Sequence, residues 1–143
     1  MNSSRERKLA KKASDGWTST GLEVLGAGDF DGTQLRRPGV YAVCFGATWC
    51  PPTRRFVPQF VARGGNPHAK FAMADITEWE SPLWDSFSIK ITPTMIVFRD
   101  GRPELRFDGR RMVGLRGSDL DKLEEALGSI GAAPTNGPPR SSG

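Results

Sequence analysis

A lone cysteine between a buried strand and a helix that starts with proline constrains this chain more than any other feature. Apolar residues that suit a central strand run from Val40 to Ala47, and Cys50 follows a short turn. Pro51 and Pro52 then suit the first turn of a helix, where their missing N–H groups have no partner to lose. Unpaired N–H groups and the macrodipole at a helix N-terminus favour a thiolate over a thiol. We therefore expect Cys50 to act as a nucleophile.

The pattern of apolar residues along the chain predicts strands and helices in alternation. We expect strands over residues 21–25, 40–47, 70–76, 95–98 and 105–107. We expect helices that start at 28–30, after Cys50, at Pro82 and at a capping Ser118, the last with Leu120, Leu123, Ala126 and Leu127 on its core face. Asp100–Gly101 predicts a hairpin turn. The order β-α-β-α-β-α-β-β-α predicts an α/β fold, with a central mixed β-sheet flanked by helices.

Composition and charge are those of a globular protein with one domain. We expect this domain over residues 17–130, between a basic disordered tail at 1–16 and a disordered tail rich in Pro, Gly and Ser at 131–143. The net charge is +4, of which the first tail contributes +3 and the second +1, so the domain itself is close to neutral. A neutral domain argues against a surface that binds nucleic acid.

The pattern also argues against a membrane or secreted protein. The chain has no run of about 18 apolar residues, so we expect no membrane span, and its polar start does not resemble a secretory signal. Two cysteines six residues apart make neither a disulfide framework nor a zinc site. We expect a monomer in the cytoplasm, with no bound metal.

Four local features together resemble the thioredoxin family over about residues 17–130: the loop Trp49-Cys50-Pro51-Pro52, Ile91-Thr92-Pro93-Thr94 before a strand, the Asp100–Gly101 hairpin, and Val113–Gly114 ahead of the last helix. The resemblance implies the thioredoxin fold and no cofactor. It implies a cis Thr92–Pro93 bond opposite Cys50, with backbone groups beside it that bind an extended peptide. Trp49, Pro51, Pro52, Thr92 and Pro93 would then form the surface that faces the substrate.

Thr53 departs from the pattern of the family. A second cysteine at this position attacks the mixed disulfide in the family, and a hydroxyl cannot do so. The Thr53 oxygen could instead hydrogen-bond the Cys50 thiolate, and an outside thiol such as glutathione would have to resolve the mixed disulfide. Two further positions also differ from the family. Cys44 stands where the family has a buried aspartate, and Met73 stands where it often has a lysine. Together these changes are consistent with a chain that gave up dithiol chemistry.

Three functions fit these residues. The leading hypothesis is thiol–disulfide exchange through Cys50, with protein disulfides or glutathionylated thiols as substrates. The second is a non-catalytic, thioredoxin-like module that binds a protein partner in the same groove. The third is a two-cysteine reductase in which Cys44 resolves the mixed disulfide. An extended segment should hold Cys44 and Cys50 farther apart than the ~7 Å between α-carbons that a disulfide permits, so we expect Cys44 to pack in the core.

Three other residues are weaker candidates. His68 is the only histidine, and it follows Pro67 in an expected loop, so we predict a surface position. Trp79 and Trp84 could form the rim of a peptide groove, but packing of a helix against the core is the interpretation we favour for both.

Overall fold

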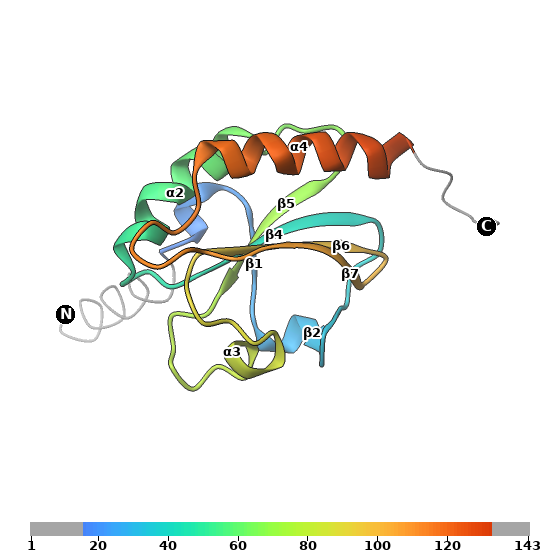
Figure 1. Ribbon diagram of the computed structural model, residues 1–143. Coiled ribbons are helices and arrows are strands. Elements are labelled where there is room, and N and C mark those ends of the chain that lie inside the picture. Colours follow the sequence, from blue (N-terminus) through green and yellow to red (C-terminus); the bar gives the residue numbers. More distant parts are fainter. Residues whose placement is uncertain (1–15, 133–143) are drawn as a thin grey trace, which may run out of the picture.

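A five-stranded sheet forms the centre of the computed structural model, which describes residues 16–132 and the side chains of 16–130 (Figure 1). Its strand order is β1-β5-β4-β6-β7. The strands are β1 (Glu23–Leu25), β4 (Val40–Gly46), β5 (Lys70–Asp75), β6 (Thr94–Arg99) and β7 (Arg102–Phe107). β1, β5 and β4 are parallel, whereas β6 and β7 pair antiparallel. The predicted mixed sheet, with a parallel part and an antiparallel hairpin, is confirmed.

Helices lie on both faces of this sheet, and β4 contributes to the two cores between them. Helices α2 (Pro51–Ala62) and α4 (Gly117–Ala132) cover one face, and α3 (Leu83–Ser86) lies on the other. Successive side chains of a strand point to opposite faces. Cys44 therefore joins the core under α2 and α4, whereas Val43 and Phe45 join the core under α3. A strand buried on both faces explains the unbroken apolar run in the sequence.

The helix expected to start at residues 28–30 is not formed, and that prediction is wrong. The chain makes a 3₁₀ turn over Ala27–Asp29 and then a small hairpin of β2 (Phe30–Asp31) and β3 (Gln34–Leu35). The glycines of this segment disfavour a helix, and Gly32 lies at φ +62°, a turn conformation that suits glycine. Phe30 and Leu35 face each other across the hairpin and are buried, so their predicted inward orientation is confirmed.

The last helix begins differently from the prediction. It starts at Gly117, and the carboxylate of Asp119 accepts a hydrogen bond from the backbone N–H of Arg116 at 2.8 Å. The cap is thus supplied from within the first turn, as in half of a capping box, and the predicted cap at Ser118 is wrong. The predicted core face is confirmed for Leu120, Leu123 and Leu127, which are fully buried, whereas Ala126 is only half-buried at the edge of this face.

Other differences between the prediction and the structure concern where helices and strands begin and end. The helix expected over residues 82–88 is the four-residue α3, and β7 begins at Arg102 rather than at residue 105. The Asp100–Gly101 hairpin turn is confirmed, and both residues have positive φ angles, as the favoured two-residue hairpin turn requires. The expected tails at residues 1–15 and 133–143 lie outside the described residues.

Candidate active site

Cys50 lies at the N-cap of α2, where the strand–turn–helix pattern predicts it. Its backbone is extended (φ −94°, ψ 115°), Pro51 and Pro52 form the start of the helix, and the carbonyl oxygen of Cys50 accepts a hydrogen bond from the N–H of Arg54 at 3.0 Å. The side chain is partly exposed, and its thiol donates a hydrogen bond to the carbonyl oxygen of Thr92 at 3.5 Å. The thiol therefore reaches both solvent and the segment before β6.

The Thr92–Pro93 peptide bond opposite this thiol is cis. Thr94 follows at the start of β6, and its hydroxyl donates to the carbonyl oxygen of Ile91 at 2.8 Å, which ties the two sides of the turn together. Residues 91–94 and the start of α2 come from distant parts of the chain, and they meet because β4 and β6 are neighbours in the sheet. Cys50, Thr92 and Pro93 therefore form one site.

Two glycines let the loop between β7 and α4 lie against this proline. A Cβ atom on Gly114 would come within 2.8 Å of Pro52 and 3.0 Å of Pro93, and Gly114 has a φ of +72°. A Cβ atom on Gly109 would come within 2.4 Å of the carbonyl oxygen of Pro93. Side chains at these two positions would push the loop away from Pro93. Gly114 is therefore a point of close approach between this loop and the cis-proline turn.

Thr53 lies beneath Cys50 but does not contact its sulfur through a hydrogen bond. The side chain is 0% exposed, and within the described part of the chain its hydroxyl has no hydrogen-bond partner. Its methyl group packs against Gly46, where an added Cβ would lie 2.6 Å away. The hydrogen bond expected between Thr53 and Cys50 is therefore not formed in this structure.

Trp17 supports the same strand end, and sequence reasoning missed it. This tryptophan is buried, and its indole N–H donates to the carbonyl oxygen of Gly46 at 3.1 Å. An added Cβ on Gly46 would also lie 3.5 Å from the Trp17 ring, so Gly46 is enclosed by Trp17 and Thr53. The sequence could have indicated this role, because a tryptophan at the beginning of the expected domain is a large aromatic residue that favours burial.

Cys44 occupies the core, as predicted. It is fully buried on β4, directly opposite Met73 of β5 and Met95 of β6, and both cysteines are free thiols. Burial raises the pKa of the Cys44 thiol far above its ordinary value, because a thiolate would lose its hydration there. Cys44 and Met73 thus make an apolar pair where the family resemblance leads one to expect charged residues.

Trp49, Trp79 and Trp84 lie together beside Cys50, and of the last two only Trp84 also packs against the core as expected. Their rings are stacked, with centroids 4.6 Å apart for Trp49 and Trp79 and 5.3 Å apart for Trp79 and Trp84. Trp79 is 69% exposed, so its predicted core position is wrong, whereas Trp84 is partly buried against the core under α3. The acidic neighbours Glu78 and Glu80, which resist burial, were the signal for exposure of Trp79.

Basic side chains also lie near the thiol. Arg54 and Arg55 are exposed in the first turns of α2, and the guanidinium of Arg54 donates to the carbonyl oxygen of Thr48 at 3.2 Å. A pocket of about 400 Å³ opens behind Pro52, and Arg55 and Arg116 are among the residues that line it. Arginines as well as tryptophans therefore lie in the neighbourhood of the thiol.

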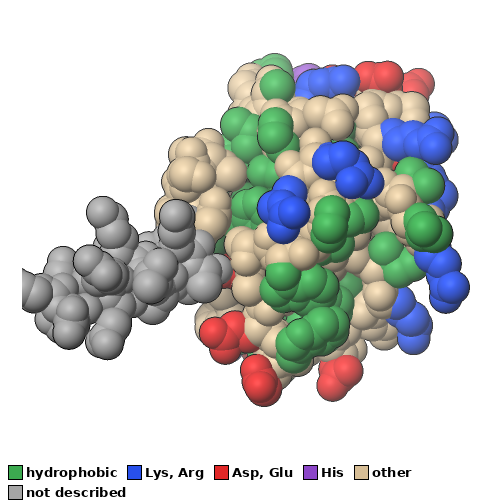
Figure 2. Space-filling view, turned by 90° about the vertical axis from the view of Figure 1, so that its left-hand side faces the viewer, with side chains coloured by type: hydrophobic (Ala, Val, Ile, Leu, Met, Phe, Trp, Pro, Cys, Tyr) green, Lys and Arg blue, Asp and Glu red, His purple; other side chains and the backbone are tan. Residues whose placement is uncertain are grey.

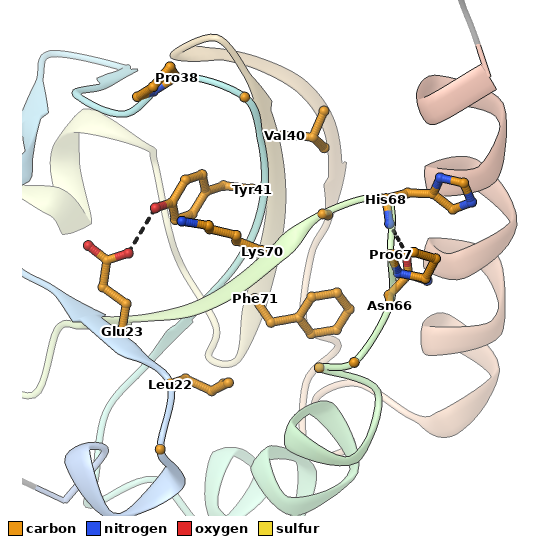
Figure 3. A pocket seen from close by; sticks show the side chains of 15 residues that line it. Leu22, Glu23, Pro38, Val40, Tyr41, Asn66, Pro67, His68, Lys70 and Phe71 are labelled. Atoms are coloured by element: carbon orange, nitrogen blue, oxygen red, sulfur yellow. Dashed lines mark hydrogen bonds between the residues drawn. The ribbon is translucent and has the colours of Figure 1, made fainter.

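A second pocket, of about 680 Å³, lies at the opposite end of the sheet (Figure 3). It is lined by residues at the beginnings of β4 and β5, among them Tyr41 and Lys70, whereas Cys50 follows the end of β4. The Tyr41 hydroxyl donates to Glu23 at 2.9 Å, and the imidazole of His68 points away from both (Figure 3). His68 is exposed, so its predicted surface position is confirmed. This pocket adds no group to the Cys50 site.

Neither a metal centre nor a membrane span is evident within residues 16–132. No group of three or more His, Cys, Asp or Glu side chains in this range could hold a metal ion. No helix among the described residues is both long enough and apolar enough to cross a bilayer.

A thiol at a helix N-terminus, opposite a cis X–Pro bond on a mixed sheet of this order, defines a thioredoxin-like domain of the thiol–disulfide oxidoreductase class. The family model described as Thioredoxin matches residues 24–118, and the chain belongs to the thioredoxin family. Thioredoxins need no cofactor, in agreement with the expectation from the sequence.

Relatives with known names and solved structures agree with this family. Thioredoxin of Chlamydia trachomatis is 30% identical over 82 residues, which are 57% of this chain and 74% of that protein. Thioredoxin Asp f 28 of Aspergillus fumigatus is 29% identical over 99 residues, which are 68% of this chain and 84% of that protein. The structure of Chlamydomonas reinhardtii thioredoxin f2 superposes with a TM-score of 0.60 at 19% identity and covers 73% of this chain and 94% of that one, which shows a shared fold.

Proposed function

We propose that this protein exchanges disulfides through Cys50 alone. The observation that supports this proposal is the pairing of a partly exposed Cys50 with a threonine, Thr53, three residues later in the helix. The other cysteine, Cys44, is 0% exposed in the core and would have to leave it to resolve a mixed disulfide. Protein disulfides and glutathionylated thiols are the substrates that we propose.

The reaction consists of two exchanges. The thiolate of Cys50 attacks one sulfur of the substrate disulfide, a new S–S bond forms, and the other sulfur leaves as a thiolate that takes a proton from solvent. With a glutathionylated thiol as substrate, the protein thiol is released and glutathione stays on Cys50. A second glutathione then attacks as a thiolate, regenerates Cys50 and leaves as oxidised glutathione. One external glutathione is therefore consumed for each glutathionylated thiol that is reduced, because the other half of the oxidised glutathione comes from the substrate. Reduction of a protein disulfide consumes two external thiols.

Backbone and apolar groups around Cys50 would orient the substrate. The backbone of Thr92 lies beside the thiol and could pair with an extended segment of the partner, as in strand addition to an exposed edge. Trp49, Pro51, Pro52 and Pro93 supply apolar contacts around this backbone. Thr53 would act from beneath, because rotation about χ1 could turn its unpaired hydroxyl toward the Cys50 sulfur when that sulfur carries charge.

Intact mass after incubation of the reduced protein with oxidised glutathione tests this proposal. We expect one glutathione adduct on the unchanged protein and on Cys44→Ala, and none on Cys50→Ser. Addition of reduced glutathione should remove the adduct, since an external thiol resolves it. Loss of two protons without an adduct, which would indicate a Cys44–Cys50 disulfide, would contradict the single-cysteine mechanism.

A non-catalytic binding module is the second candidate, and the exposed tryptophan rings beside Cys50 favour it. This function predicts that a partner binds equally well to Cys50→Ser and that no exchange accompanies binding. For either function we propose a monomer in the reducing environment of the cytoplasm, which is consistent with two free thiols.

A further inference from the structure

Three stacked indoles form a surface beside Cys50, which we call the tryptophan ledge: Trp49, Trp79 and Trp84. All three pairs of rings are close to parallel, with interplanar angles of 25°, 12° and 17°. Trp79 is 69% exposed and Trp49 is 40% exposed, although each stacks on its neighbours. Large aromatic surface is seldom left in water without a function.

Two of the three indole N–H groups of the ledge already have partners within the protein. The indole N–H of Trp49 donates to the carbonyl oxygen of Thr77 at 2.7 Å, and that of Trp84 donates to the carbonyl oxygen of Glu78 at 3.1 Å. These bonds hold both rings in place, so that only the ring surface not covered by stacking is left for a ligand. A partner would therefore be recognised through aromatic faces, which attract apolar groups and cations.

The charges around the ledge favour a cation. Glu78, Glu80 and Asp85 are exposed, and none of them takes part in an ion pair with another residue in the range 16–130. No Lys, Arg or His occurs from residue 71 to residue 89. Three carboxylates that form no ion pair within residues 16–130, together with the exposed indole surface, give a negative surface that complements an Arg or Lys side chain.

The surroundings of the ledge can be followed in Figure 2, which shows how charged and hydrophobic side chains are distributed on one face of the molecule. Figure 2 views the molecule from the end at which α2 begins, and hydrophobic side chains run through the middle of this face. Asp and Glu lie along its lower border, on the side where α3 lies in Figure 1, and also at its upper right, whereas Lys and Arg lie at the top, at the centre and on the right-hand side. The lower border of this face is therefore acidic.

We propose that the tryptophan ledge binds an Arg- or Lys-bearing extended segment of the protein partner. The cation would lie on the exposed face of Trp79, near Glu78 and Glu80, while the adjacent disulfide of the same segment reaches Cys50. This inference rests on the proposed function in naming a disulfide partner, but binding of the cationic segment itself requires no exchange.

Three matched peptides test the ledge on the full-length protein. Each is nine residues long and has serine in place of the reactive cysteine, with two neighbours that are arginine, citrulline or glutamate. Citrulline has nearly the shape of arginine without its charge, so the comparison isolates the cation. We expect the arginine peptide to bind most tightly, as measured by tryptophan fluorescence and calorimetry, and to lose affinity as sodium chloride is raised.

Variants of the ledge identify the contact. Trp79→Ala should weaken binding of the arginine peptide about 2- to 5-fold, the range for a cation–π contact at an exposed site. Trp79→Phe should retain part of it, because its ring face is weaker. The double variant Glu78→Gln, Glu80→Gln should reduce the salt dependence. Glu125→Gln, an exposed glutamate on α4, is the matched control and should change nothing.

Equal affinity for the arginine and citrulline peptides, or an unchanged affinity in both Trp79 variants, would overturn the inference. A parallel measurement with disulfide-bearing forms of the peptides separates it from the proposed function. Binding without formation of a mixed disulfide would retain the ledge and exclude exchange. Exchange at equal rates with all three peptides would retain the function and exclude the ledge.

Discussion

Thr53 and Thr94 are both fully buried threonines at the candidate site, but their hydroxyls are in different situations. The Thr94 hydroxyl donates to the carbonyl oxygen of Ile91, whereas the Thr53 hydroxyl has no partner within the described residues. Burial of an unpaired polar group costs about 1–3 kcal/mol. The unpaired hydroxyl of Thr53 therefore lowers the stability of the fold at the position where the family has its second cysteine.

Replacement of these two threonines by valine should therefore change stability in opposite directions. We expect Thr53→Val to raise the free energy of unfolding by about 1 kcal/mol, because a methyl group replaces an unsatisfied hydroxyl of the same size. Thr94→Val should lower it by about 1 kcal/mol, because it breaks a buried hydrogen bond. Urea unfolding measures both. A destabilised Thr53→Val protein would mean that the hydroxyl has a partner in solution.

A hydrogen bond from the Thr53 hydroxyl to the Cys50 thiolate would also affect the reaction of Cys50. Thr53→Val should then form the glutathione adduct more slowly, although the folded protein is more stable. Thr53→Ser keeps a hydroxyl and serves as the control, since it should retain more of the rate.

Cys44 is a residue whose burial makes stability depend on pH. Its pKa is raised in the folded protein, so it keeps its proton at a pH where the unfolded chain loses it. The folded state then binds more protons, and stability should fall as the pH rises above the ordinary thiol pKa of about 8.5. Below about pH 8 the thiol is protonated in both states and contributes no pH dependence.

Urea unfolding between pH 8 and 10 tests this linkage. In the unchanged protein, Cys44 should make the unfolding free energy fall with pH, by up to about 1.4 kcal/mol per pH unit near pH 10. Cys44→Ala should lack this part of the pH dependence. Only the slopes are compared, because the cavity in Cys44→Ala lowers stability at every pH. Tyr41, whose pKa is also raised, mainly by burial, is present in both proteins. Identical slopes would show that Cys44 is accessible to solvent.

At the scale of elements, the loop between β7 and α4 holds the cis-proline turn against the start of α2. Gly114 is the contact point, because its missing side chain leaves room for Pro52 and Pro93, and its positive φ suits glycine. The loop is further held to α4, since Arg110 pairs with Asp119 at 3.0 Å and Asp119 also caps the helix. The β7–α4 loop, the cis-proline turn and the start of α2 therefore meet at one junction behind Cys50.

Gly114→Ala should disturb this junction. The added methyl group would meet Pro52 at 2.8 Å in a backbone conformation that alanine disfavours, so we expect a loss of about 1–3 kcal/mol in unfolding free energy. Adduct formation at Cys50 should slow as well, because Pro93 would shift relative to the thiol. Gly65→Ala is the matched control, with open space around its Cβ and no positive φ. Equal stability of both variants would argue against a packed junction.

At the scale of the whole molecule, cationic and anionic side chains both lie around the thiol. Arg54 and Arg55 are exposed in the first turns of α2, and Glu78 and Glu80 are exposed as the neighbours of Trp79 in the chain. The net charge of the domain, which is close to neutral, conceals these local charges. A partner with charges complementary to both groups would be bound in a single orientation, since reversal of its direction would bring like charges together.

The sequence by itself determined the strand–cysteine–helix junction and the mixed sheet, and its motifs carried the resemblance to the family. The junction and the sheet follow from local chemistry, since apolar patterns mark the strands and two prolines mark the start of α2. The helix expected at residues 28–30 failed because the competing hairpin is stabilised by contacts of Phe30 with Phe45 and Phe87, which lie far away in the sequence.

Only the tertiary structure decided which groups meet at the site. The unpaired hydroxyl of Thr53 depends on how its methyl group packs against Gly46, and the tryptophan ledge depends on a loop after β5 that folds back over Trp49. Such contacts join residues that are distant in the chain, and their geometry is set by the sheet order rather than by any local pattern.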